Sequence, residues 1–320
     1  MTPRDGVLVV DKPPGPTSHD VVDIVRGHAG GMRAGHTGTL DPFASGVLPV
    51  CIGRATRLSR FLTSTRKAYS GIIRLGVATD TYDREGRTTF EAPVDHLDVS
   101  HVASAAAAFV GVFMQAPPVY SARKSRGKPA HRLVRSGRPV TLKPAKVTVY
   151  RFDIERVAFP AVEFSLECAA GTYVRSIAHD LGRALGCGAH LTELRRLAAG
   201  RFRIHEAHTL DRIEEKGRGG ALDEIVIPMD RMDLGLPTVT VTPSGQAAMC
   251  HGRPISRLEL AAPAPAGAAG PVRVESESGR LIGIAVPAMS PTENEAFRPD
   301  VVLWAETDLP GGTFTPRRRP

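Results

Sequence analysis

The segment 35–42 near the N-terminus gathers side chains that could take part in catalysis. It reads GHTGTLDP and holds one imidazole, two hydroxyls and one carboxylate around two glycines. Glycine allows backbone conformations that a loop approaching a ligand often needs, and Pro42 disfavours the helical region for Asp41. The sequence therefore predicts a loop that presents the carboxylate of Asp41 from extended backbone. An ordinary Asp-Pro surface turn is the alternative on local grounds.

The carboxylate of Asp41 could attack the anomeric carbon of a sugar and form a covalent intermediate, as in retaining glycosidases. It must be ionised to do so, and an adjacent guanidinium would favour that state. Arg175 falls in the first turn of an expected helix, where its charge opposes the helix dipole, so we expect a carboxylate partner elsewhere.

The glycosidic bond of a folded nucleic acid is reached only after the nucleotide is flipped out, and an aromatic ring can then stack on its base. Tyr69 begins an expected strand close to Lys67 and could supply that ring, although core packing is the alternative. With Asp41 and Arg175, these residues predict covalent catalysis on a nucleoside within RNA or DNA.

Charge also indicates a polyanionic partner. The chain has 41 Lys and Arg against 33 Asp and Glu, a formal net charge of +8. Nine basic residues and no acidic residue lie between Ser121 and Lys146. A solvated basic face is the alternative, but the absence of interleaved acids favours contact with nucleic-acid phosphates. We expect Arg126 and Lys128 to contribute to it.

Several function classes are disfavoured. No apolar run is long enough to span a bilayer, and the N-terminus lacks a signal-peptide core, so we expect a cytoplasmic protein without membrane contact. The four cysteines are scattered, which argues against a disulfide framework. Cys187 and His190 have the spacing of half a zinc site with no second half, so we expect no metal. Walker, GxGxxG and HExxH motifs are absent.

The elements that must position these side chains can be predicted from periodicity. Residues 67–75 and 161–168 alternate like half-buried strands, a pattern that suits an antiparallel sheet. Ser18 is expected to cap a helix that precedes the loop, and a second helix follows Gly171. The polar stretch 77–93 is expected to be a loop.

Five motifs occur in a fixed order along residues 5–230. They are Asp11-Lys12-Pro13 with Gly15, Thr17 and Ser18, the loop 35–42, Lys67-x-Tyr69, Gly171-Thr172-Tyr173-Val174-Arg175, and Leu194-Arg195-Arg196-Leu197. Together they resemble the TruB family of tRNA pseudouridine synthases, bacterial type. The resemblance implies that uridine at position 55, in the T-loop of tRNA, is converted to pseudouridine without a cofactor or metal.

The resemblance also assigns roles to single residues. It implies that Asp41 is the covalent nucleophile, that Arg175 pairs with it, and that Tyr69 stacks on the target base and is a candidate proton acceptor. Tyr173 and Leu194 would line the uracil pocket, while His36 would help to hold the flipped loop. We expect six residues to contribute to substrate binding: His36, Tyr173, Leu194, Arg126, Lys128 and Lys12. Lys12 would do so by supporting the active-site loop.

The fold class that the resemblance implies is α/β (α+β), with a mixed, largely antiparallel sheet, flanking helices and a small PUA-like C-terminal β domain. We expect a catalytic domain over residues 1–235 with a basic, thumb-like insertion at about 117–146. The C-terminal domain would cover 236–310, before a disordered tail at 311–320.

The expected partner is the T-arm of tRNA, with no protein partner required and a monomeric protein. Two other functions fit the same residues. A nucleoside or RNA glycosidase would use the carboxylate of Asp41 but release free base. A non-catalytic tRNA-folding chaperone would need the basic surface and not the carboxylate.

Overall fold

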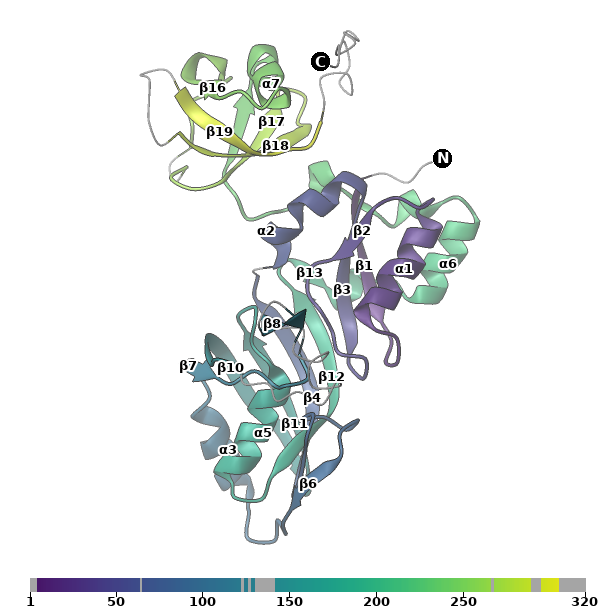
Figure 1. The fold of residues 1–320 in the computed structure, drawn as a ribbon, viewed down its shortest axis with the longest axis vertical. Coiled ribbons are helices and arrows are strands. Elements are labelled where there is room, and N and C mark those ends of the chain that lie inside the picture. Colours follow the sequence, from purple (N-terminus) through teal and green to yellow (C-terminus); the bar gives the residue numbers. More distant parts are fainter. Residues whose placement is uncertain are drawn as a thin grey trace.

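The computed structural model describes residues 5–63, 65–121, 124–125, 128–129, 142–265, 268–288 and 295–304. These residues form a large sheet flanked by helices and a smaller C-terminal sheet (Figure 1). The expected fold class is thereby confirmed. Most of the basic insertion, including Arg126 and the side chain of Lys128, and the tail 311–320 lie outside the described residues.

The large sheet has ten strands and is mixed but largely antiparallel. Its main order is β14-β1-β3-β12-β4-β11-β10-β7, with β2 paired to β3 and β13 paired to β12. The strands are β1 (Gly6–Lys12), β2 (Ala34–His36), β3 (Ser45–Ile52), β4 (Lys67–Leu75), β7 (Gly111–Gln115), β10 (Ala145–Ala158), β11 (Ala161–Cys168), β12 (Ala189–Ala199), β13 (Phe202–Arg203) and β14 (Ile227–Pro228).

Helices cover the two halves of this sheet separately. In Figure 1, α1 and α6 lie beside β1 and β3, whereas α3 and α5 lie beside β4, β10 and β11. The main core lies between these helices and the sheet. It is built from the apolar faces that periodicity predicts, with Val21, Phe164 and Ile177 fully or almost fully buried. The helices are α1 (Ser18–His28), α2 (Ser59–Thr63), α3 (Val99–Ala107), α5 (Val174–Ala184), α6 (Leu210–Arg218) and α7 (Pro243–Cys250).

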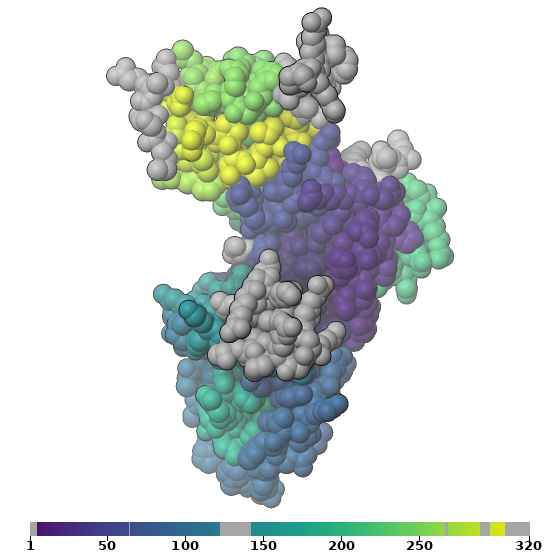
Figure 2. Space-filling view, viewed as in Figure 1, coloured from purple at the N-terminus to yellow at the C-terminus, as the bar shows by residue number. Residues whose placement is uncertain are grey.

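The C-terminal sheet has its own small core and also packs against the main sheet. Figure 2 shows it, in green and yellow, against the blue and purple N-terminal elements. Leu281, Ile284 and Leu303 share one buried cluster with Val7 and Leu58 of the large unit. The strand order is β15-β17-β18-β19-β16, with β15 (Thr238–Val241), β16 (Ile255–Ser256), β17 (Val272–Ser276), β18 (Leu281–Pro287) and β19 (Glu295–Val302).

The stretch 77–93 was expected to be a loop and is instead a short hairpin. Its strands are β5 (Val77–Thr79) and β6 (Thr88–Glu91), which pair antiparallel. A second short hairpin pairs β8 (Lys124–Ser125) with β9 (Lys128–Pro129). The first hairpin lacks a clear apolar alternation because β6 is exposed along its length. It therefore carries no periodic signal that would distinguish it from a polar loop.

No helix within the described ranges is long and apolar enough to cross a membrane.

The seam between the two halves of the large sheet is the contact of β3 with β12. It is the one parallel pair among the described strands of that sheet, with Arg195 opposite Ser45 and Arg196 opposite Gly46. Gly46 has φ +100°, and a Cβ built on it would lie 2.2 Å from the carbonyl oxygen of Arg196. Only glycine allows both the backbone angle and this close approach of the two strands.

We expect Gly46→Ala to lower the free energy of unfolding by about 3 kcal/mol or more, because it strains the backbone and also forces β12 away from β3. Denaturant titration measures this loss. Gly220→Ala is the matched control, since Gly220 has φ +66° but nothing within 4 Å of the added Cβ. It should cost only about 1–2 kcal/mol. Equal losses in the two variants would contradict the importance of the close approach.

Candidate active site

An open cleft of about 650 Å³ lies at the seam of the large sheet. The loop that connects β2 to β3 forms one side, and the N-terminal ends of β4 and α5 contribute to the other. Six side chains named from the sequence line it together: His36, Asp41, Tyr69, Tyr173, Arg175 and Leu194. The tertiary structure thus brings together residues that lie as far apart as 158 positions in the chain.

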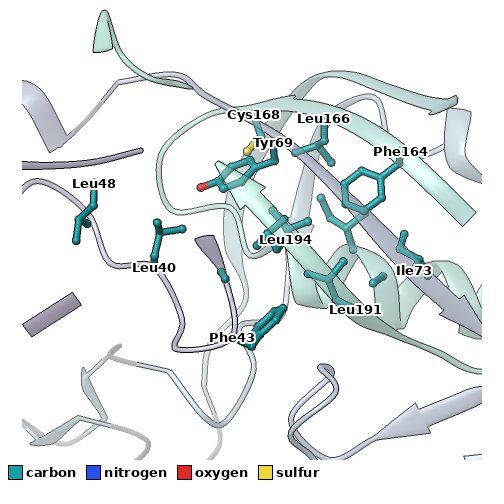
Figure 3. Packing of buried hydrophobic residues seen from close by; sticks show 14 of the residues in the cluster. Leu40, Phe43, Leu48, Tyr69, Ile73, Phe164, Leu166, Cys168, Leu191 and Leu194 are labelled. Carbon is teal, nitrogen blue, oxygen red and sulfur yellow. The ribbon is translucent and has the colours of Figure 1, made fainter. Parts of the chain in front are cut away.

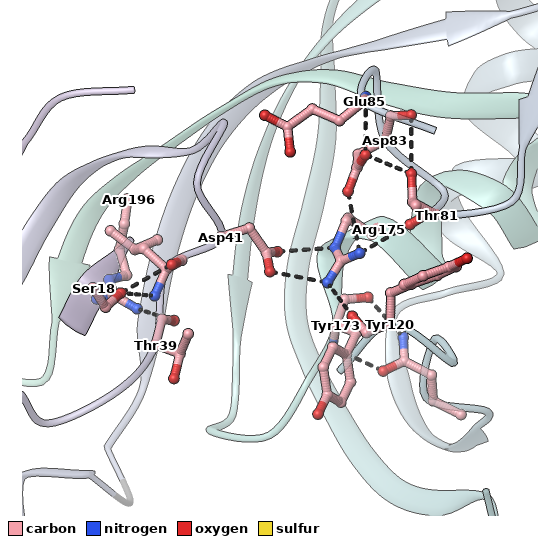
Figure 4. Close-up of polar contacts among 12 residues, drawn as sticks. Ser18, Thr39, Asp41, Thr81, Asp83, Glu85, Tyr120, Tyr173, Arg175 and Arg196 are labelled. Atoms are coloured by element: carbon pink, nitrogen blue, oxygen red, sulfur yellow. Dashed lines mark hydrogen bonds and ion pairs between the residues drawn. The ribbon is translucent and has the colours of Figure 1, made fainter. Parts of the chain in front are cut away.

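The carboxylate of Asp41 meets the guanidinium of Arg175 through two contacts. Nη2 of Arg175 donates to Oδ1 at 2.9 Å, and Nε lies 2.9 Å from Oδ2 (Figure 4). The arginine side chain is 5% exposed, whereas the aspartate side chain is 32% exposed. The arginine is therefore fixed inside the protein while the carboxylate faces the cleft. The carboxylate partner expected for Arg175 is confirmed.

Arg175 is also held from its other side by a second carboxylate, Asp83. Nη1 of Arg175 donates to Oδ2 of Asp83 at 3.1 Å and to the carbonyl oxygen of Thr81 at 2.9 Å. Nη2 reaches the carbonyl oxygen of Tyr120 at 3.1 Å. Asp83 is oriented in turn by the Thr81 hydroxyl and the Glu85 backbone N–H. The guanidinium thus has a single well-defined orientation toward the cleft.

Asp83 was not identified from the sequence. It lies in the turn of the β5–β6 hairpin, in the stretch expected to be a polar loop, and it has no motif of its own. A buried aspartate in a polar turn cannot be told from an exposed one by periodicity. Its 4% exposure and its contact with Arg175 appear only in the folded chain.

The surroundings of Asp41 make its carboxyl less acidic than an exposed one. Burial raises the pKa of Asp41, the nearby charge of Asp83 adds to that increase, and the ion pair with Arg175 opposes it. The arginine therefore offsets part of the desolvation cost, and the pKa of Asp41 is still raised overall.

Lys12 supports the Asp41 loop from behind and does not line the cleft. Its side chain is fully buried, and Nζ donates to the carbonyl oxygens of Pro13 at 2.9 Å, Pro42 at 3.0 Å and Ala44 at 2.7 Å. These three bonds use every N–H of the ammonium group. Burial lowers the pKa of Lys12 to about 8. The arrangement fits the expected support role and gives no direct contact with a ligand.

Arg196 supports the same loop from β12. Its Nη2 donates to the Gly38 carbonyl at 3.0 Å, Nη1 to the Thr39 carbonyl at 3.3 Å, and Nε to the Val47 carbonyl at 2.7 Å. Arg196 belongs to the motif Leu194-Arg195-Arg196-Leu197, but the motif predicts no role for it, because its contacts lie 149 to 158 residues away in the chain.

Ser18 was expected to be the N-cap of α1, but Thr17 holds that position. The Thr17 hydroxyl accepts from the backbone N–H of Asp20, whose carboxylate accepts from the Thr17 N–H, which completes a capping box. The Ser18 hydroxyl instead donates to the Leu40 carbonyl at 2.9 Å and accepts from the Leu40 N–H at 2.8 Å. It therefore fixes the residue that precedes Asp41.

Tyr69 lies at one edge of the main core, beside Cys168 and Leu166, with its hydroxyl pointing out of the cluster (Figure 3). Burial raises the pKa of its phenol, so the neutral ring is favoured near pH 7. Leu194 lies in the same core cluster and also lines the cleft. A flat ring and an aliphatic side chain at the wall of a cleft can hold a planar base.

His36 and Tyr173 contribute differently. Burial, with the charge of Arg196 acting in the same direction, lowers the pKa of His36, and its Nδ1 accepts from the Gly38 N–H at 3.3 Å. Tyr173 precedes α5, where its backbone N–H and carbonyl both bond to the buried amide of Gln115. That pair of bonds fixes the start of the helix that carries Arg175.

Among the described residues, no group of three or more His, Cys, Asp or Glu side chains could hold a metal ion. Cys187 is buried, and His190 Nδ1 lies 2.8 Å from the Val77 carbonyl oxygen.

Comparison with known proteins gives a consistent result. The N-terminal domain model of the TruB family of pseudouridylate synthases matches residues 26–174, and the C-terminal domain model of tRNA pseudouridylate synthase B matches residues 175–232. The tRNA pseudouridine synthase B of Solibacter usitatus is 45% identical, over 78% of this chain and 85% of the relative. The corresponding protein of Thermobifida fusca is 42% identical, over 88% and 94%.

A solved structure is also similar over most of its length. A chain of the Cbf5–Nop10–Gar1 crystal structure matches with a TM-score of 0.72 and 28% sequence identity. The match covers 94% of this chain and 86% of the other.

We expect Lys12 to make the stability of the protein depend on pH. Because its folded pKa of about 8 lies below its usual value of 10.5, the unfolded chain binds more protons between these values, and this contribution to stability rises with pH. The unfolding free energy of the wild type minus that of Lys12→Met should therefore increase from pH 8 to pH 10.5, by up to about 3 kcal/mol. Denaturant titration at each pH measures it.

The test compares the two proteins because Cys51 and Cys168 make the stability fall as pH rises, in the opposite direction to Lys12. Burial raises the pKa of each thiol to about 12, and both proteins share this effect. A difference that stays flat or falls as the pH rises would contradict the buried position of Lys12.

Proposed function

The chain belongs to the TruB family of pseudouridylate synthases, and we propose that it acts on uridine 55 in the T-loop of tRNA with Asp41 as the covalent nucleophile. Because the chain belongs to this family, it is a tRNA pseudouridine synthase, an isomerase that rejoins uracil to its ribose through C5. The position of the uridine and the role of Asp41 are the proposal.

One observation carries the assignment of the nucleophile: a partly exposed carboxylate on the wall of a cleft, held in two places by a buried guanidinium. In the proposed reaction one oxygen of Asp41 bonds to C1′ of the ribose as the C1′–N1 bond breaks and uracil leaves with the electron pair. The base turns, its C5 bonds to C1′, and the Asp41 carboxylate is released. C5 then loses a proton and N1 gains one, so the net change is an isomerisation.

The neighbouring residues fit the steps on the sugar and the base. Arg175 orients the carboxylate for attack and, because Asp83 holds its far side, needs no rearrangement during the reaction. We assign Tyr69 to stacking on the base together with Leu194. Burial favours the neutral phenol of Tyr69, so this ring is a weak proton acceptor near neutral pH.

The target nucleotide must leave the stack to reach Asp41, since the carboxylate lies inside a cleft. We assign His36 to the residues that hold the flipped nucleotide, and Tyr173 to the wall of the uracil pocket. Arg126 and Lys128 are proposed to contact phosphates of the T-arm, as the run of basic residues around them suggests.

We expect Asp41→Asn to abolish pseudouridine formation while the affinity for tRNA stays within a few fold, because the amide keeps the shape and loses the nucleophile. Mapping of pseudouridine in an unmodified tRNA transcript measures product and position together. The wild type should modify position 55 alone and release no free uracil. Free uracil would indicate a glycosidase, and full function of Asp41→Asn would indicate a chaperone.

The pH profile of kcat/KM offers a second test. Activity should be lost as pH falls and Asp41 takes up a proton, at a higher pH than for an ordinary aspartate, because burial raises its pKa. Asp83→Asn removes a like charge, so the pKa of Asp41 should fall and the acid limb should move to lower pH. The maximal rate should also fall about 10-fold or more, since Arg175 loses its second anchor.

Asp180→Asn is the control for this profile, because it removes a negative charge from α5 that is not among the main causes of the pKa shift of Asp41. Its acid limb should coincide with that of the wild type. A shift of the Asp83→Asn limb to higher pH would contradict the charge arrangement around Asp41.

A further inference from the structure

Lys67, at the start of β4, is a cleft residue that the proposed chemistry does not use. It is 6% exposed and lines the same cleft as Asp41. Its Nζ donates to the Thr63 carbonyl at 3.2 Å and to the Thr65 hydroxyl at 2.8 Å. An ammonium group has three donors, so one N–H is left over. Within the described part of the chain, no carboxylate forms an ion pair with Lys67.

Among charged groups, Arg196, another cation, has the largest effect on the pKa of Lys67. Burial first, and then the charge of Arg196, lowers the pKa of Lys67 to about 8. A Cβ built on Gly38 would lie 4.0 Å from Cε of Lys67 and 3.9 Å from Nη1 of Arg196. The two cations therefore flank the same glycine of the active-site loop. A buried ammonium beside a guanidinium is costly unless an anion joins them.

The position of Lys67 relative to Tyr69 indicates which anion this is. The two residues are two positions apart on β4, so their side chains share one face and lie about 7 Å apart along the strand. A nucleotide whose base meets Tyr69 can therefore place a phosphate of its own backbone beside Lys67. Lys67 belongs to β4 and Asp41 to the loop between β2 and β3, so the two residues contribute to different sides of the cleft.

We propose that Lys67 and Arg196 form an anion site that binds a backbone phosphodiester flanking the flipped nucleotide of the RNA substrate. The proposal rests on the function proposed above, because it takes its anion from the same RNA. Thr63 and Thr65 hold the ammonium in place, and the remaining N–H donates to the phosphate. Gly38 has no side chain, whereas a Cβ at this position would contact both cations.

The site predicts a proton linkage. A bound phosphate favours the charged amine, so RNA binding should raise the pKa of Lys67 and draw in a proton above pH 8. The groups that face Lys67 are Arg196 on β12, the Cys168 thiol on β11 and the two threonines, and none of them is a carboxylate. RNA affinity should thus weaken as pH rises from 7 to 9.

The test is a double-mutant cycle between the protein and the RNA. A T-arm stem-loop carries one neutral methylphosphonate in place of each phosphate flanking the target uridine, one per RNA, and Asp41→Asn protein prevents turnover during the binding measurement. At the contacted position the neutral linkage should weaken binding about 10-fold. In protein that also carries Lys67→Met, the same linkage should cause little further loss.

Lys216→Met is the matched control, because Lys216 lies on α6 and pairs with Glu224. The methylphosphonate should weaken binding to this variant as much as to the parent. If the methylphosphonate and Lys67→Met weaken binding independently at every flanking position, so that their losses add, the anion site is refuted. Unchanged RNA affinity of Lys67→Met would also refute it. If the losses add but the wild-type protein still forms pseudouridine at position 55, only the anion site is refuted and the proposed function stands. If the wild-type protein forms no pseudouridine at position 55, the proposed function itself is refuted.

Lys67→Arg supplies a second measurement in case Lys67→Met does not fold. Arginine keeps its charge over the whole range, so the loss of RNA affinity between pH 7 and pH 9 should become smaller than in the parent protein. Lys12, whose pKa is also about 8, is present in both proteins and cancels in the comparison. An identical pH dependence of the two proteins would overturn the proposal.

Discussion

The contact between Asp41 and Arg175 is the interaction on which the rest of the site depends. The two residues are 134 positions apart, and one belongs to a loop while the other belongs to the first turn of a helix. Burying a guanidinium is costly unless its N–H groups are all satisfied. Here Asp41, Asp83 and two backbone carbonyls accept from the two Nη groups of Arg175, while Nε lies 2.9 Å from Oδ2 of Asp41 as an ion pair without a hydrogen bond. The protein thereby fixes the guanidinium that orients the carboxylate of Asp41.

The loop that carries Asp41 is stabilised by buried side chains and not by a regular strand ladder. Backbone carbonyls that are buried need hydrogen-bond donors, and Lys12, Ser18 and Arg196 supply them at Gly38, Thr39, Leu40, Pro42 and Ala44. Each donor comes from a different element: β1, α1 and β12. A loop anchored to three elements can line an open cleft and still hold the carboxylate of Asp41 in one geometry.

The same arrangement explains why the cleft lies where the two halves of the large sheet meet. β3 follows the Asp41 loop, and β12 carries both Arg196 and Leu194, so the parallel contact at Gly46 places one wall of the cleft against the other. β4 continues the second wall with Lys67 and Tyr69. The order of the strands in the sheet, more than any single helix, therefore determines which side chains meet.

Much of this protein can be predicted from its sequence because the relevant signals are local. Alternation predicted β4 and β11, the Gly-rich loop before an apolar strand indicated Asp41, and the unfavourable place of Arg175 in a helix indicated a carboxylate partner. Ser18, Lys67 and Arg196 belong to the quoted motifs and Asp83 to none, but the contacts of all four carry no comparable signal, since they depend on which backbone and side-chain groups the fold brings near. Whether a charge is buried, and what it faces, depends on how the strands pair, and only the tertiary structure determines that.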